Sequence, residues 1–276
     1  MNVLLAILMA IVFSVTPAIA ESPDATTIVK QVKEIFEPLR SSTRKVVVTS
    51  TCKIEGSQKN ESIQFVAGEA RKTFPNGKRI LLVMLKPQSV KGNTYLFWEP
   101  EKQQNFITLF YSPFLRRVRE FLPVELYDRF LDTNFTYADL GFVRFHEHYK
   151  LLGEEEHAGV HAYKVVEELP HERSYYSHIY IWVAADSFLP LQRDYYDTGG
   201  RLWKTELFKE VVTINNVPTP LLIQMKDRDG FSTDLKVTEV KYDVEIPDEL
   251  FNPNLLSKAV DSPLWQGYGS QTTKDK

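Results

Sequence analysis

The stretch that decides the fold is GKRILLVMLK, residues 77–86, followed after a turn by TYLFW, residues 94–98. Successive side chains of a β-strand point to opposite faces of its sheet, so the first strand is apolar on both faces. One face carries Ile80, Leu82 and Met84, and the other carries Leu81, Val83 and Leu85. An antiparallel sheet that lies on water has one polar face, so we expect this strand to be covered on both sides.

The remainder of the chain is typical of one domain built mainly from strands. Apolar residues at helical spacing predict an amphipathic helix over Thr27–Arg40, and β-branched and aromatic residues dominate from Lys45 onward. Turn dipeptides such as Asn76-Gly77 separate the strand-like runs and predict antiparallel hairpins. We predict one domain over residues 21–256 and a loose tail over residues 257–276, because periodicity ends after Ser257.

Residues 1–20 have the pattern of a secretory signal peptide. Leu4–Ile19 is almost wholly apolar and ends in Ala18-Ile19-Ala20, a small-x-small cleavage pattern. An uncleaved anchor is the alternative, because no Lys or Arg precedes the apolar run, but Pro17 and the shortness of the run favour cleavage after Ala20. We therefore expect a soluble periplasmic protein. Its one cysteine, Cys52, excludes an intramolecular disulfide, so the fold depends on its core.

The charge of the chain argues against a nucleic-acid partner. The formal net charge is −3, without the basic excess of a nucleic-acid binder. The acidic run Glu154-Glu155-Glu156 is interpreted as a solvated turn.

Three architectures keep both apolar faces of such strands out of water. A two-layer sandwich buries both faces against other strands. A membrane barrel exposes one apolar face to lipid, but its other face is polar, unlike these strands. The third is a strongly curved sheet whose concave face forms an apolar pocket beneath helices that can leave it.

The segment Pro123–Leu131 suits such a cover. Pro123 fits a first helical position, and Leu126, Phe130 and Leu131 fall on one side of the helix. A helix this short depends on packing, so a ligand that competes for the same surface can release it. The alternative is an ordinary core helix in a fixed position.

Six different short motifs follow one another along the chain: LRRVR (115–119), NFTYADL (134–140), IWV (181–183), LPL (189–191), VPTP (217–220) and PDELF (247–251). In this order they resemble the outer-membrane lipoprotein-sorting family, the LolA-like proteins. The resemblance implies a half-open β-barrel wrapped around helices, whose interior carries lipid or lipidated protein through the periplasm. The sequence departs from the family pattern at Asp132-Thr133-Asn134, where a Gly-containing turn is expected.

The fold class that we predict is therefore mainly β with α, a single curved antiparallel sheet covered by helices. We assign the cavity to Leu82, Met84, Phe97, Trp98, Tyr180 and Trp182, and the lid to Leu126, Phe130 and Leu131. Strand periodicity divides each strand into two faces but does not identify the concave one. Arg116, Arg117 and Arg119 are a candidate docking patch for an acidic partner or lipid headgroup, with protection of a sheet edge as the alternative. An inner-membrane exporter and an outer-membrane acceptor are the expected partners of a monomeric carrier.

Two other functions are weaker alternatives. His146 and His148 share a strand face, but no third ligand follows at a diagnostic spacing, and no Gly-x-Ser-x-Gly elbow supports a hydrolase. We therefore predict no catalytic residue, metal or cofactor. A sensor of lipid or mislocalised lipoprotein uses a similar curved sheet and signals to a partner protein.

Overall fold

The computed structural model describes residues 23–36, 41–53, 60–100, 106–140, 148–169 and 174–268. The predicted signal peptide, residues 1–20, and His146 lie outside these ranges. None of the helices in the described part of the chain is long and apolar enough to cross a membrane.

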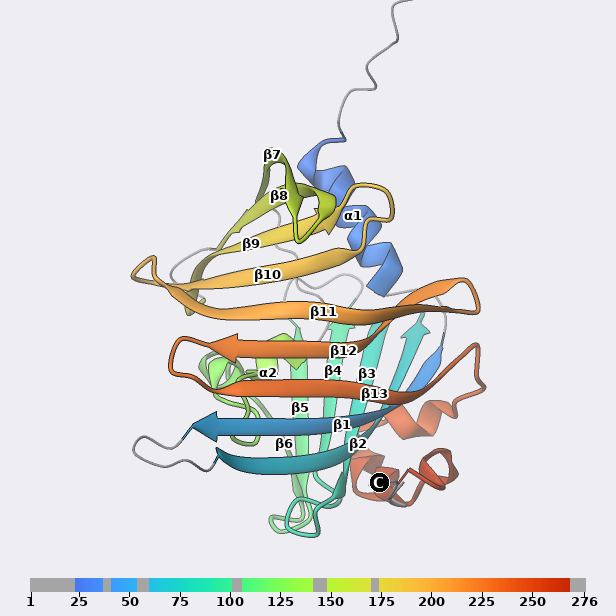
Figure 1. Ribbon diagram of the computed structural model, residues 1–276. Coiled ribbons are helices and arrows are strands. Elements are labelled where there is room, and N and C mark those ends of the chain that lie inside the picture. The colour runs from blue at the N-terminus through green and yellow to red at the C-terminus, as the bar shows by residue number, and fades with distance from the viewer. Residues whose placement is uncertain are drawn as a thin grey trace, which may run out of the picture.

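Thirteen antiparallel strands form one sheet, in the order β6-β5-β4-β3-β2-β1-β13-β12-β11-β10-β9-β8-β7 (Figure 1). Their bounds are β1 Ser42–Lys53, β2 Asn60–Phe74, β3 Gly77–Lys86, β4 Thr94–Pro100, β5 Ile107–Ser112, β6 Arg117–Glu120, β7 Tyr149–His157, β8 Val160–Glu168, β9 Tyr176–Ala184, β10 Pro190–Asp197, β11 Leu202–Ile214, β12 Val217–Asp227 and β13 Ser232–Tyr242. The sheet is open, with β6 and β7 at its edges. Pairing of β1 with β13 joins the first and the last strand of the chain at the centre of the sheet.

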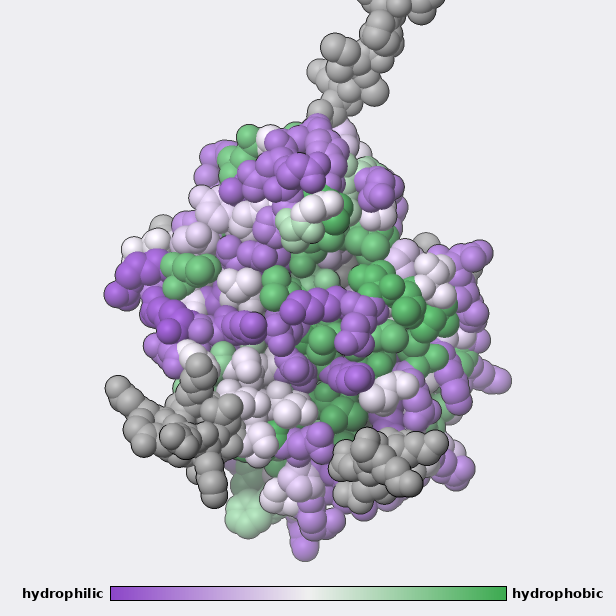
Figure 2. Space-filling model, in the orientation of Figure 1, coloured by the Kyte–Doolittle hydropathy of each residue, from purple (hydrophilic) through white to green (hydrophobic). Residues whose placement is uncertain are grey.

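Strong curvature gives the sheet an inner and an outer face. Figure 1 shows β11–β13, β1 and β2 in front, β3–β5 behind them, and α2 (Tyr137–Leu140) between the two walls. We call the surface that faces α2 the inner face. Polar and apolar residues mix on the outer surface of the front wall (Figure 2). The single curved antiparallel sheet predicted from the sequence is confirmed.

Helix α1 (Ala25–Phe36) covers one half of the inner face. Asp24 begins it, because its Oδ1 accepts a hydrogen bond from the Thr27 backbone N–H at 2.7 Å. Ile28 and Val32 on its apolar side are fully buried against Ile181 and other residues of β8, β9 and β12. The other half of the inner face is covered by residues 121–140, which connect β6 towards β7.

The outer face of β3 and β4 is covered by the carboxyl-terminal segment, which corrects the prediction of a loose tail. Three 3-10 helices, η2 (Asp248–Phe251), η3 (Pro253–Asp261) and η4 (Pro263–Trp265), pack there. Leu81, Val83 and Leu96 are completely buried beneath them. Short 3-10 turns lack the regular spacing of an α-helix, so the sequence pattern concealed them. Residues 269–276 lie outside the described residues.

Trp265 fixes this cover in place. Its ring lies over Gly68 of β2, where a Cβ atom would come within 2.4 Å of the ring. The indole Nε1 donates a hydrogen bond to the Ala259 carbonyl at 2.7 Å. Glycine at position 68 therefore makes room for the ring that anchors the carboxyl-terminal segment.

Candidate ligand site between the sheet and residues 121–140

The inner face of β3 and β4 is covered by a segment that we call the lid, residues 121–140. The lid begins with η1 (Pro123–Tyr127), a 3-10 helix with Pro123 at its start. The Glu125 carboxylate accepts a hydrogen bond from the Leu122 backbone N–H at 2.7 Å and pairs with Arg119 at 2.8 Å. The helix is shorter than the predicted Pro123–Leu131, because Asp128 is extended. So short a helix depends on its packing.

That packing joins most of the predicted lid and cavity residues. Leu126 and Phe130 are buried in one cluster with Leu82, Met84 and Phe97 of the sheet. Leu131 is partly buried against the same cluster. The structure thus brings six of the nine predicted cavity and lid residues together.

Aromatic rings from the lid and the sheet interlock within this cluster. The Tyr95 ring of β4 lies 4.8 Å from the Phe110 ring of β5 and 5.4 Å from the Phe130 ring of the lid. Phe121 and Tyr137, at opposite ends of the lid, have ring centroids 4.6 Å apart. Burial raises the pKa of Tyr95, so its phenol stays neutral. The surface beneath the lid is therefore apolar, aromatic and uncharged.

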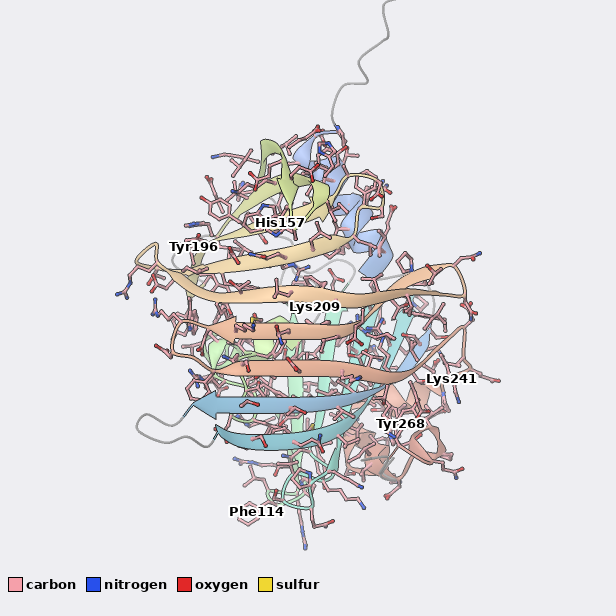
Figure 3. The ribbon with its side chains drawn as sticks, in the orientation of Figure 1. Phe114, His157, Tyr196, Lys209, Lys241 and Tyr268 are labelled. Carbon is pink, nitrogen blue, oxygen red and sulfur yellow. The ribbon has the colours of Figure 1, made fainter. Side chains whose placement is uncertain are left out.

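Trp98, Tyr180 and Trp182 were wrongly assigned to the cavity and lie on the outer face. Trp98 follows the inward-facing Phe97, and its ring lies 4.6 Å from the Arg79 guanidinium. The Trp182 ring stacks on His157 at 4.6 Å and lies 6.3 Å from the Tyr180 ring. Figure 3 shows His157 and Tyr196 on this exterior.

The inward-facing residues of β9 are instead Ile179, Ile181 and Val183, which pack in the cluster of α1. The sequence pattern of β9 gave the correct division into two faces. The aromatic half was mistaken for the concave half, because large rings also stabilise exposed sheet surfaces by stacking across strands.

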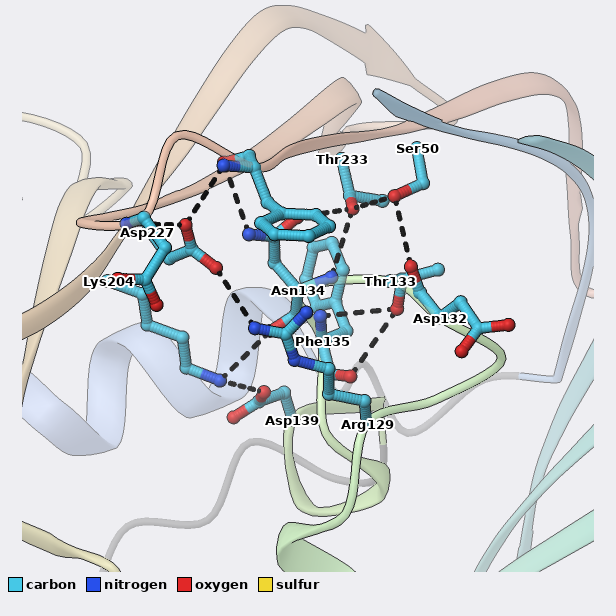
Figure 4. Close-up of polar contacts among 12 residues, drawn as sticks. Ser50, Arg129, Asp132, Thr133, Asn134, Phe135, Asp139, Lys204, Asp227 and Thr233 are labelled. Carbon is cyan, nitrogen blue, oxygen red and sulfur yellow. Dashed lines mark hydrogen bonds and ion pairs between the residues drawn. The ribbon is translucent and has the colours of Figure 1, made fainter. Parts of the chain in front are cut away.

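A buried ion pair holds the second half of the lid to β11 (Figure 4). The Lys204 Nζ lies 2.5 Å from the Asp139 Oδ2, and both side chains are almost completely buried. Lys204 also donates to the Asn134 carbonyl at 3.3 Å. Tyr176 of β9 donates its hydroxyl proton to the Asp139 Oδ1 at 3.0 Å. Burial, followed by the Asp139 charge, raises the pKa of Tyr176, which therefore remains a donor.

A second polar contact ties the same half of the lid to β13 and β1. The Thr233 hydroxyl donates to the Asn134 Oδ1 at 2.7 Å, and the Asn134 amide nitrogen Nδ2 donates to the Phe231 carbonyl at 3.2 Å. Ser50 donates to the Asp132 carbonyl at 3.3 Å. Sequence reasoning missed these residues, since nothing in a strand pattern marks a polar side chain as buried.

The two halves of the lid meet at two residues with left-handed backbone. Leu131 has φ 45° and Asp132 has φ 60°, a conformation that favours glycine. This is where the sequence departs from the Gly-containing turn of the family pattern. A turn is present, but non-glycine residues make it. Apolar and polar contacts hold both halves: before the turn Arg129 pairs with Asp227 of β12 at 3.5 Å, and after it Phe135 is buried in the cluster of α1. The almost completely buried ion pair, Asp139–Lys204, lies after the turn.

The three candidate docking arginines divide into two groups. Arg116 and Arg117 are exposed at the start of β6. Arg119 pairs with Glu125 of the lid, and its guanidinium lies 4.6 Å from the Phe121 ring. Arg119 therefore supports the lid and is not a free docking group.

Of the two histidines considered as metal ligands, His148 is exposed just before β7 and His146 lies outside the described residues. His161 bonds to Glu154 at 2.8 Å in an exposed position. Within the described residues, no cluster of three or more His, Cys, Asp or Glu side chains is arranged to hold a metal ion.

Solved structures share the fold of this chain, and one of them is described as a LolA superfamily protein. A putative outer membrane lipoprotein-sorting protein domain from Vibrio parahaemolyticus is 20% identical with a TM-score of 0.74, over 84% of this chain and 97% of that one. A DUF1329 family protein from Desulfovibrio piger is 24% identical with a TM-score of 0.73, over 84% and 96%. A LolA superfamily protein from Nitrosomonas europaea is 20% identical with a TM-score of 0.66, over 84% and 98%.

A comparison of the sequence with models of protein families identifies the family of this chain. A family model described as uncharacterized protein matches residues 76–258, more than half of the chain, and the chain belongs to that family. No curated protein matches the chain. The resemblance to LolA-like proteins predicted from the sequence is confirmed at the level of fold.

Proposed function

We propose that this protein is a periplasmic carrier that holds an acyl chain of a lipid or lipidated protein between the inner face of the sheet and the lid. The observation that carries the proposal is the apolar surface of Leu82, Met84 and Phe97 beneath a helix of only five residues. Such a surface suits a flexible hydrocarbon, which needs burial and no directed polar contact.

The two halves of the lid have different roles in this proposal. Leu126 and Phe130 contact the sheet through apolar groups, and an acyl chain replaces such contacts with equivalent ones. The Asp139–Lys204 pair is different, because a hydrocarbon cannot satisfy a buried charge. Cargo therefore displaces the contacts of Leu126 and Phe130, while the Arg129–Asp227 and Asp139–Lys204 pairs keep the lid attached to the sheet.

The energetics favour a carrier that is loaded by another protein. Burial of an acyl chain is worth about 0.8 kcal/mol per methylene, so about fifteen methylenes contribute on the order of 12 kcal/mol relative to water. The sequence contains no nucleotide-binding loop, so the energy for loading comes from outside the chain. An exporter in the inner membrane and an acceptor at the outer membrane are the partners that this cycle needs.

The test compares two buried side chains of the lid with an exposed one. Leu126→Gln with Phe130→Gln removes apolar contacts above the cargo, so we expect release of a fluorescent fatty acid to acceptor vesicles to become at least about tenfold faster. Val124→Gln is the matched control, because Val124 is 55% exposed on the same helix. Equal release rates in both variants would contradict the proposal. Thermal unfolding of each variant separates loss of retention from loss of fold.

A further inference from the structure

The turn between β5 and β6 exposes apolar and basic side chains together. Phe114 is 91% exposed, the highest value among the large apolar residues of the described chain, and Leu115 is 46% exposed. Arg116 and Arg117 follow directly and are also exposed. Figure 3 shows Phe114 at the end of the molecule opposite α1, and Figure 2 shows an apolar projection there. We call residues 113–117 the tip.

The tip has a defined conformation. The Arg116 backbone N–H donates to the Ser112 carbonyl at 2.8 Å, and the left-handed backbone of Arg116, φ 50°, completes the turn. At its base, Pro113 fits against Gly92 of the β3–β4 turn, where a Cβ atom would lie 2.9 Å from the proline ring. The fold thus presents Phe114 to solvent in an ordered turn, and removal of Phe114 from water requires a partner.

The charges of the tip and of the turn that packs beside it have one sign. The tip, PFLRR, contains two arginines and no acidic residue. The turn PQSVKG, residues 87–92, packs beside it, contributes the exposed Lys91 and likewise contains no acidic residue. An aromatic ring with an aliphatic neighbour beside three cations matches the interface of an anionic bilayer, where apolar groups enter the acyl boundary and cations meet phosphates.

We propose that the tip docks this protein on anionic lipid membranes, with Phe114 and Leu115 inserted and Arg116 and Arg117 on the headgroups. A projecting tip favours a bilayer over a folded partner, because a bilayer deforms around an inserted side chain and needs no complementary pocket. The proposal is independent of cargo, since the tip lies outside the surface beneath the lid. The chain from the tip leads within a few residues to Arg119 and the lid, so docking brings the lid close to the membrane.

Vesicle flotation without cargo tests the proposal. We expect wild type to bind vesicles of phosphatidylglycerol with phosphatidylcholine, and to bind pure phosphatidylcholine vesicles at least about tenfold more weakly. Phe114→Ser with Leu115→Ser should weaken binding to the anionic vesicles about tenfold or more, with thermal unfolding unchanged because the ring is exposed. Arg116→Gln with Arg117→Gln should remove the preference for the anionic lipid. Residues before position 23 are the same in every variant, so differences report the tip.

The matched control is Val211→Ser with Val212→Ser, because these residues are 41% and 39% exposed in β11. This variant should float like wild type. Failure of wild type to float at low salt, or equal flotation of the Phe114 variant, would overturn the proposal. If the Phe114 variant keeps its vesicle binding but loses binding to a purified envelope protein, the tip is a protein-docking surface and the membrane proposal is wrong.

Discussion

Lys204 places a charge inside the curved sheet, and its ammonium group lies 5.2 Å from the rings of Tyr176, Tyr195 and Trp203. Asp139 supplies the compensating charge from the lid. Removal of one member of such a pair leaves an unpaired charge in the interior, which is the costly case. Asp139→Asn should therefore lower the free energy of unfolding by about 3–5 kcal/mol and increase hydrogen exchange of lid amides.

A more exposed pair, Glu125 of the lid with Arg119 of β6, provides the comparison. Glu125→Gln breaks the contact with the partly exposed Arg119 and should change the free energy of unfolding by about 1 kcal/mol or less. Adding Lys204→Met to Asp139→Asn removes the unpaired cation and should restore part of the loss. Urea unfolding measures all three variants, and an Asp139→Asn change no larger than that of Glu125→Gln would show that the pair does not hold the lid.

At the scale of elements, the carboxyl-terminal 3-10 helices determine whether β3 is covered on its outer face. Trp265→Ala should lower the free energy of unfolding by about 3–5 kcal/mol, because it removes a buried ring from a closely packed cluster. Gly68→Ala should destabilise the fold through the same contact, since the added methyl group meets that ring. The exposed Lys258→Ala serves as the control in urea unfolding. Changes within about 0.5 kcal/mol for Trp265→Ala would mean that the segment is not a structural cover.

The same element shows how far the sequence predicts the fold. The strand of residues 77–86 is apolar on both faces and therefore needs cover on both. The structure provides the lid on the inner face and the 3-10 helices on the outer face. The sequence identified the inner cover, because Leu126 and Phe130 have helical spacing. It missed the outer cover, because 3-10 turns have no comparable pattern. The sequence also could not identify the concave face of β9. The two-residue alternation of side chains assigns residues to two faces, but it does not show which face points inward.

For the whole molecule, the apolar surfaces of the sheet lie under three covers, which are α1 and the lid on the inner face and the carboxyl-terminal helices on the outer face. Helix α1 and the carboxyl-terminal helices are held by extended buried clusters. The lid before Leu131 also packs in an extended buried cluster, and Arg129 pairs with Asp227 at 3.5 Å, but its only helix spans five residues. This difference predicts that cargo enters beneath the lid and leaves the other covers in place.

Native mass spectrometry of protein purified from the periplasm of its own host, followed by lipid extraction, tests this account most directly. We predict an added mass that extraction identifies as lipid or lipidated protein, and loss of that mass in Leu126→Gln with Phe130→Gln but not in Val124→Gln. A single apo mass, together with no uptake of a fluorescent fatty acid, would contradict the account and leave the space beneath the lid as an ordinary filled core.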